Sequence, residues 1–332
     1  MKAVYFEKGG AASALQYGDL ETPSHCNANQ VLVRIEAIGI NPIDAKIRIT
    51  PERFPVSFPV IPGCDAAGVV EATGLHVQSF KPGDEVYFSQ PGFNHRQGTY
   101  AEYALVDTSL LALKPRSLSF EQAAAVPLVF ITAWEALYDR ACITDDQTVL
   151  IHAGAGGVGH AAIQLAKLAG AKVITTVSNE EKANFVKQLG ADQIINYRTQ
   201  DVIAEVLRWT AGKGVDIALD TIGSDVLQSC FYCVKPYGDV VTILQPTPEN
   251  NWSEARKRNM RFSFELMLSP VLMELEDAKQ HQGEILRRCA TLFDENKLII
   301  QIAHIFDLAE AAVAQHFLEQ NHPIGKLVMR HK

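Results

Sequence analysis

Six consecutive residues carry the clearest chemical signal in this chain, a glycine-rich turn with the pattern GxGxxG. They are Gly154, Ala155, Gly156, Gly157, Val158 and Gly159. An apolar run ending at Ile151 precedes the turn, a helical pattern follows it, and a second apolar run begins at Val173. In this order the first glycine permits a tight turn, the second a close approach to a pyrophosphate, and the third close packing of helix on strand. Because the helix N-terminus also offers unpaired N–H groups, the motif predicts a dinucleotide-binding turn. A glycine-rich turn without a ligand is the alternative.

The second strand of this unit ends at a small hydroxyl residue instead of an acid. Sites for NAD place Asp or Glu about 20 residues after the glycines to bind the ribose 2′-hydroxyl. Here that position carries Ser178, and Lys182 lies one helical turn further on. Glu180 and Glu181 argue the other way, but the first turn of a helix favours acids. The sequence therefore predicts NADPH over NADH, with a solvated surface lysine as the alternative for Lys182.

Composition limits the class of protein. The chain has 332 residues, 47% of them hydrophobic, and a formal net charge of −8. This length supports two domains with their own cores, and the negative charge argues against a nucleic-acid partner. Without an apolar run of roughly 18 residues or a secretory signal, we expect a cytoplasmic protein with no membrane partner. The six cysteines are scattered, and Cys230 and Cys233 share an apolar helical face, which indicates reduced core thiols.

The organisation along the chain changes near residue 122. Short strands broken by glycine and proline before it are typical of a compact β domain, whereas strand and helix patterns alternate after it, as a doubly wound parallel sheet requires. The predicted strands of that sheet are 149–152, 173–177, 193–196, 215–219, 239–244 and 261–266. The tail regains strand character at Ile299–Ile300 and Lys326–Met329. We therefore predict an α/β chain of two domains, 1–122 with 298–332 and 123–297, with the active site in the cleft between them.

Several motifs match one family over nearly the whole chain. They are Met1–Val4, Gly39–Asp44, Pro62–Gly68, Pro82–Val86, Gly98–Tyr103, Ala123–Pro127, Thr132–Glu135 and Gly325–Lys326. With them the chain resembles the medium-chain dehydrogenase/reductases, specifically the zinc-free quinone oxidoreductase branch. The resemblance implies a GroES-like β domain, a Rossmann nucleotide-binding domain and hydride transfer from NAD(P)H.

The resemblance also raises the question of zinc. It places the catalytic zinc ligands of the zinc-dependent alcohol dehydrogenases at Asn41, Cys64 and Leu128. Such a metal needs three Cys, His or carboxylate ligands, and Asn and Leu do not supply them. The cysteines of the structural zinc lobe are missing as well, since residues 87–103 contain no Cys. We therefore predict no bound metal. The alternative is a site improvised from Asp44, Asp65 and His95.

Without a Lewis acid the accessible chemistry narrows. The full charge of an alkoxide needs a metal or a well-placed proton donor. Hydride addition to a quinone, or to the β-carbon of an enone, spreads the charge so that a few hydrogen-bond donors suffice. The resemblance suggests Asn41 for holding the nicotinamide carboxamide or the substrate oxygen, with Lys46 as a second donor and Asp44 as an orienting residue. Turn formation by the Asn41–Pro42 pair is the alternative.

Further cofactor contacts carry over from the resemblance. Thr132 is expected to face the nicotinamide or its ribose, and Tyr197 to lie beside the adenosine phosphate. The segment containing Ile222 ends the fourth strand and passes the nicotinamide ribose, while Leu244 and Gln245 end the fifth strand. The alternatives are a helix-interior threonine and a surface-packed tyrosine.

Together these residues predict an enzyme that reduces quinones or α,β-unsaturated carbonyl compounds with NADPH. A zinc-independent alcohol or ketone oxidoreductase is the alternative among enzymes. A non-catalytic, crystallin-like NADPH-binding protein is the alternative of another class. Loops 49–58 and 247–258 are expected to line the substrate pocket. The edge segment 261–266 alternates apolar with polar residues, and an unpaired edge of that kind favours a homodimer through paired strands.

Overall fold

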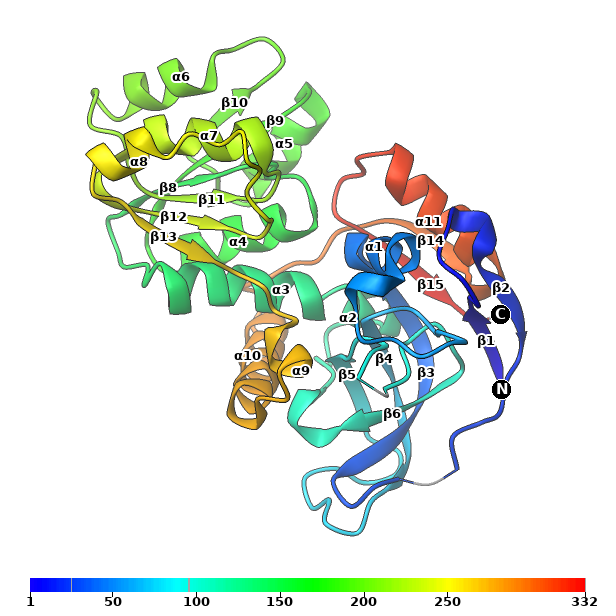
Figure 1. Ribbon diagram of the computed structural model, residues 1–332. Coiled ribbons are helices and arrows are strands. Elements are labelled where there is room, and N and C mark those ends of the chain that lie inside the picture. The colour runs from blue at the N-terminus through cyan, green and yellow to red at the C-terminus, as the bar shows by residue number, and fades with distance from the viewer. Residues whose placement is uncertain (25, 95, 332) are drawn as a thin grey trace. The chain divides into compact units, whose positions relative to one another are not determined.

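The computed structural model describes residues 1–24, 26–94 and 96–331, and the chain divides into two compact units (Figure 1). The first unit consists of Met1–Ile131 and Leu268–Lys332, and the second of Thr132–Met267. The division thus falls nine residues after the predicted boundary at 122 and thirty residues before the one at 297. Among the described residues, no helix has both the length and the apolar character that crossing a membrane requires.

The second unit is a parallel sheet with helices between its strands. The strands are β8 (Thr148–Ile151), β9 (Lys172–Val177), β10 (Gln193–Asn196), β11 (Val215–Asp220), β12 (Val234–Thr242) and β13 (Arg261–Phe264). The helices are α4 (Gly157–Leu168), α5 (Glu180–Gln188), α6 (Val202–Trp209), α7 (Ser224–Cys233) and α8 (Ser253–Lys257), preceded by the π-helical turn η4 (Glu135–Arg140) that continues α3 (Pro127–Trp134).

The strand order in this sheet is β10-β9-β8-β11-β12-β13. All six predicted strands are confirmed, although β13 ends at Phe264, two residues before the predicted end. Strands such as β8 are continuous apolar runs because helices cover both faces of a parallel sheet. The order reverses between β8 and β11, and the carboxyl ends of the strands at such a switch point are where dinucleotides bind.

The first unit is a mostly antiparallel sheet in the order β14-β15-β3-β4-β5-β7, with β6 paired to β3 and a separate β1–β2 ladder. The strands are β1 (Lys2–Tyr5), β2 (Gln16–Asp19), β3 (Gln30–Ile40), β4 (Asp65–Thr73), β5 (Glu85–Ser89), β6 (Tyr103–Asp107), β7 (Leu111–Leu113), β14 (Ile302–Asp307) and β15 (Lys326–Arg330). The helices and short turns are α1 (Pro42–Ile49), α2 (Phe120–Ala124), α9 (Ser269–Leu272), α10 (Glu276–Asp294), α11 (Ala311–Gln320), η1 (Ala12–Ala14), η2 (Pro51–Arg53), η3 (Thr108–Leu110) and η5 (Leu308–Glu310). The predicted strand at Ile299–Ile300 is wrong, because β14 begins at Ile302.

Helix α10 explains why the units divide earlier than the sequence predicts. Tyr87 of β5 donates a 2.5 Å hydrogen bond to the carbonyl of Leu286, and the ring of Phe293 packs edge-on against Phe130 with centroids 5.2 Å apart. At Gly283 an added Cβ would lie 2.3 Å from the carbonyl oxygen of Ser109, so the helix lies directly on the first unit. The sequence prediction placed this helix in the parallel-sheet domain because it follows the alternating strands and helices. Its buried contacts show that it belongs to the β domain.

Candidate functional site

The glycine-rich turn joins β8 to α4, and Gly156 is the residue immediately before the helix. Gly156 has extended backbone angles, and an added Cβ would meet only the carbonyl oxygen of Ala153, at 3.3 Å. Gly156, Gly157 and Val158 are half-buried, whereas Ala155 is buried. The protein's own packing therefore leaves the space above Gly156 open, as a pyrophosphate next to the helix N-terminus requires.

Gly154 and Gly159 are needed for packing. An added Cβ would lie 2.0 Å from Oγ1 of Thr175 at Gly154 and 2.2 Å from the carbonyl oxygen of Ala153 at Gly159. The left-handed residue of the turn is Ala153, with φ of 50°, so the expectation that Gly154 supplies the turn conformation is wrong. Gly154 is a glycine because the turn lies against β9.

Ser178 directly follows β9, Tyr197 directly follows β10, and Lys182 lies in the first turn of α5. The two strand ends are joined by a hydrogen bond from the Tyr197 N–H to the carbonyl of Val177, 3.1 Å long. Asn179 caps α5 by accepting a hydrogen bond from the N–H of Lys182, so this lysine lies in the first turn of the helix that follows β9. Tyr197 is 51% exposed, and within the described part of the chain the Lys182 ammonium forms no ion pair. We call these three side chains the β9/β10 edge.

The carboxyl ends of β11 and β12 are held by a side chain whose role sequence reasoning missed. Asp220 is fully buried, and its Oδ1 accepts from the N–H groups of Ile222 and Gly223 at 3.0 and 2.9 Å. Its Oδ2 accepts from the hydroxyl of Thr242 at 2.7 Å. This turn leaves Ile222 50% exposed at the switch point.

The other predicted contacts differ in exposure. Leu244 is half-buried and Gln245 is exposed after β12, while Thr132 is buried within α3. His152, which immediately follows β8, is also buried, and burial lowers its pKa to about 4 against the opposing effect of Asp220. The imidazole at the start of the turn is therefore neutral at physiological pH.

In the first unit a cluster of buried polar side chains surrounds the start of α1. Its members are Asn41, Asp44, Cys64, Asp65, Tyr100 and Lys326, and we call it the polar cluster. The Asn41 amide donates to Oδ2 of Asp65 at 2.9 Å, and its carbonyl oxygen accepts from the Lys326 ammonium. Lys326 also donates to the carbonyl of Ile40 at 2.8 Å. Both ends of the Asn41 amide are thus bound by protein groups.

Asp44 connects this cluster to the helix and to Tyr100. Its Oδ2 accepts from the N–H of Asn41 at 2.9 Å and from the Tyr100 hydroxyl at 3.1 Å. Its Oδ1 is buried and, within the described residues, accepts no hydrogen bond. Burial, and then the charge of Asp65, raise the pKa of Asp44 to about 7, so this carboxyl holds its proton for part of the time at neutral pH.

Burial also shifts the pKa values of Asp65, Lys326 and Cys64 in the direction that favours the uncharged form of each group. Burial raises the pKa of Asp65, and the opposing charge of Lys326 limits that rise. Burial likewise lowers the pKa of the Lys326 ammonium and raises that of the Cys64 thiol. Asp65 also accepts from the N–H of Leu128 at 3.1 Å, which links the cluster to the first turn of α3.

The structure therefore brings Asn41 and Asp44 together and separates Lys46 from them. Lys46 is exposed on α1, although partial desolvation still lowers the pKa of its ammonium. Sequence reasoning considered Asp65 only as a ligand of an improvised metal site, and it quoted Gly325–Lys326 only as a family motif. The available signal was the charge of Asp65 and Lys326 in otherwise apolar strand starts, because charged residues are rarely fully buried unless paired.

These side chains do not fit a zinc ion. Among the described residues no three His, Cys, Asp or Glu side chains are placed to hold a metal, and His95 lies outside those residues. Of the positions that bind zinc in the metal-dependent relatives, Asn41 accepts from an ammonium, and Leu128 contributes a backbone N–H. A divalent cation would have to share this small buried volume with the positive charge of Lys326.

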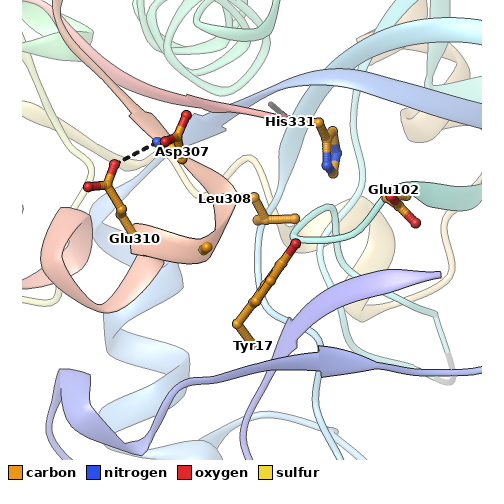
Figure 2. A pocket seen from close by; sticks show the side chains of 7 residues that line it. Tyr17, Glu102, Asp307, Leu308, Glu310 and His331 are labelled. Carbon is orange, nitrogen blue, oxygen red and sulfur yellow. Dashed lines mark hydrogen bonds between the residues drawn. The ribbon is translucent and has the colours of Figure 1, made fainter.

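Two hollows lie elsewhere on the molecule. One, of about 260 Å³, is lined in the first unit by Tyr17, Glu102, Asp307, Leu308, Ala309, Glu310 and His331 (Figure 2). The other, of about 510 Å³, is lined by Trp252, Ser253, Arg256 and Lys257 of the predicted pocket segment 247–258. None of the predicted catalytic or cofactor-binding residues lines either hollow.

Comparison with known proteins agrees with this two-domain fold. Residues 27–116 match the alcohol dehydrogenase GroES-like domain family, and residues 189–329 match the family described as zinc-binding dehydrogenase. A zinc-type alcohol dehydrogenase-like protein of Staphylococcus epidermidis is 31% identical over 93% of this chain and 92% of its own length. The quinone oxidoreductase of Sus scrofa is 37% identical over 65% of this chain, which spans 64% of that relative. The crystal structure of Escherichia coli quinone oxidoreductase complexed with NADPH is 28% identical, with a TM-score of 0.88 over 99% of this chain and 100% of that chain.

Fold and motifs together define a medium-chain dehydrogenase/reductase, with a GroES-like domain and a Rossmann-type domain. Within that superfamily the chain belongs to the quinone oxidoreductase branch.

Proposed function

We propose that this chain reduces quinones or α,β-unsaturated carbonyl compounds with NADPH and without a metal. The observation that carries the proposal is the β9/β10 edge, where Ser178 ends β9 in place of an acid, Lys182 follows in the first turn of α5, and the exposed Tyr197 ends the neighbouring strand. A 2′-phosphate supplies the negative charge that this edge lacks. The NADPH complex of the Escherichia coli relative supports the same cofactor choice.

Bound NADPH would supply a hydride to a conjugated acceptor. The groups of this chain then have separate tasks. The half-buried turn from Gly156 to Val158 and the N-terminus of α4 bind the pyrophosphate, and Asp220 holds the loop that carries Ile222. We assign Lys46 as the donor to the developing oxygen charge, with Asn41 and Asp44 holding the helix that presents it.

The reaction class is tested by following NADPH oxidation with a panel of quinones, enones, simple ketones and aldehydes. We expect turnover with quinones or enones and little with simple ketones. Steady consumption with simple ketones alone would favour the alcohol or ketone oxidoreductase. NADPH binding without consumption across the panel would favour the non-catalytic, crystallin-like protein.

We also propose a homodimer formed by pairing of β13 with its symmetry mate. This strand is at the edge of the sheet, and Phe264 at its end is 53% exposed. Phe264→Lys should convert a dimer into a monomer in light scattering at micromolar concentration. Phe317→Lys on α11, where the native ring is 37% exposed, is the matched control and should stay dimeric. A monomeric wild type would refute the proposal.

A further inference from the structure

Lys326 is a charged residue in the interior of the first unit, with only 4% of its surface exposed. Its ammonium donates to the carbonyl of Ile40 at 2.8 Å and to the side-chain oxygen of Asn41. Burial lowers the pKa of this ammonium, and the carboxyls of Asp65 and Asp44 oppose that shift. The ammonium is therefore held in the interior by two oxygen acceptors at the junction of β3 and α1.

The backbone fixes this placement. Gly325 has φ of +81°, and an added Cβ there would lie 2.2 Å from the carbonyl oxygen of Gln301, so the turn before β15 needs glycine. The N–H of Lys326 donates to the same carbonyl at 2.9 Å. The next residue, Leu327, pairs with Ile40 at the end of β3, so Lys326 begins its strand beside Asn41.

The bond from Lys326 also decides how the Asn41 amide is oriented. With the ammonium on the oxygen, the NH₂ group must point the other way, toward Oδ2 of Asp65 at 2.9 Å. Asp65 in turn accepts from the N–H of Leu128 in α3. The ammonium of Lys326 thus begins a chain of contacts that includes Asn41 and Leu128. These are two of the three positions at which zinc-dependent relatives bind the metal.

We propose that Lys326 is the positioning cation of this site and that its ammonium takes the place of the metal ion of the zinc-dependent relatives. Its bond to the amide oxygen orients Asn41, whose NH₂ group binds Asp65, so that the first turn of α1 keeps one geometry. The side chain acts through Asn41 and Asp65. The expected effect on turnover rests on the function proposed above. The need for a positive charge at position 326 is tested separately, by the melting temperature.

The first variant is Lys326→Ala, with propylammonium chloride added to return the missing charge and neutral propanol as its uncharged counterpart. We expect turnover with the best quinone or enone to fall about 100-fold, as displacement of a positioned group by about 1 Å does. NADPH affinity should change less than about twofold, because the Lys326 ammonium binds Ile40 and Asn41 and not the glycine-rich turn. Propylammonium, and not propanol, should restore turnover.

Lys279→Ala is the matched control. Lys279 is 5% exposed in the same unit, and its ammonium is paired with Glu276 at 2.7 Å. If loss of any buried lysine merely loosened the unit, both variants would lose turnover equally and propylammonium would rescue neither. That result would overturn the proposal, as would unchanged turnover in Lys326→Ala or equal rescue by propanol.

Two further measurements keep the proposal testable if activity or folding fails. Propylammonium should raise the melting temperature of Lys326→Ala and leave that of the wild type unchanged, whatever the substrate is. If Lys326→Ala does not fold, the double variant Lys326→Met, Asp65→Asn removes both charges together, and wild-type turnover in it would overturn the proposal.

One zinc per wild-type chain by elemental analysis would also overturn it. A wild type that turns over no quinone or enone refutes the proposed function, while the melting-temperature test still decides the role of Lys326.

Discussion

In the first unit Asn41, Asp65 and Lys326 are buried and bind one another, whereas in the second unit Lys182 and Tyr197 keep solvent contact at the end of a sheet. Both groups place polar side chains at strand ends. In the first group the side chains form hydrogen bonds with other groups of the protein. In the second group the ammonium of Lys182 and the hydroxyl of Tyr197 are available as donors to a ligand. Polar groups that are satisfied internally hold a geometry, and polar groups without internal partners are available to a ligand.

The same contrast exists within the glycine-rich turn. Gly159 is close to backbone atoms of the turn itself, while Gly156 faces open space. The first serves the fold and the second serves the ligand.

Gly159→Ala should have the largest effect on cofactor binding. Its added methyl would lie 2.2 Å from the backbone oxygen of Ala153, so the turn must shift. Without cofactor, the free energy of unfolding should fall by about 1–3 kcal/mol in urea denaturation. NADPH affinity should fall at least about 100-fold, or about 3 kcal/mol, in a fluorescence titration.

Gly156→Ala is the counterpart that sharpens the comparison. Its methyl meets the protein only at 3.3 Å, so stability without cofactor should stay within about 0.5 kcal/mol of the wild type. NADPH affinity should still fall, because the methyl occupies space that the pyrophosphate needs. If Gly156→Ala destabilises the protein as much as Gly159→Ala, the two glycines do not have separate roles.

Asp44→Asn should change how stability depends on pH. The pKa of Asp44 is raised from 3.8 to about 7 on folding, so the native state holds this proton more tightly than the unfolded state. The stabilisation from this group is complete below about pH 4 and is lost as pH rises through about 7, by an amount of about 4 kcal/mol. In Asp44→Asn this loss should disappear.

Urea unfolding of wild type and variant between pH 5 and pH 8 measures the difference. The control is Asp277→Asn at an exposed position of α10, which should keep the wild-type pH dependence. Parallel curves for wild type and Asp44→Asn would show that the buried carboxyl does not titrate in this range.

Lys182→Ala should have the smallest effect and the greatest selectivity. A charge-assisted hydrogen bond contributes about 1.5–3 kcal/mol, so NADPH affinity should fall roughly tenfold or more. NADH affinity should hardly change, since it has no 2′-phosphate. Lys187→Ala, at an exposed position further along α5, is the control. Equal binding of NADH and NADPH by the wild type would contradict the assignment of the β9/β10 edge.

The sequence predicted the parts of the structure that depend on local pattern. The strands of the parallel sheet and the turn at Gly154–Gly159 follow from apolar runs and glycine spacing over a few tens of residues. The polar cluster could not be predicted in this way. Lys326 and Asn41 are 285 residues apart, and Tyr100 and Asp44 are 56 apart, so their contacts depend on strand pairing that no local pattern encodes.

The most direct test of the proposed mechanism is to locate the transferred hydride. The protein, treated with a chelator and shown by elemental analysis to contain no zinc, is given NADPH deuterated at C4 and an α,β-unsaturated ketone. The product is then examined by NMR. The proposed mechanism predicts deuterium at the β-carbon of a saturated ketone. Deuterium at the carbinol carbon of an allylic alcohol, or loss of turnover that added zinc restores, would contradict it.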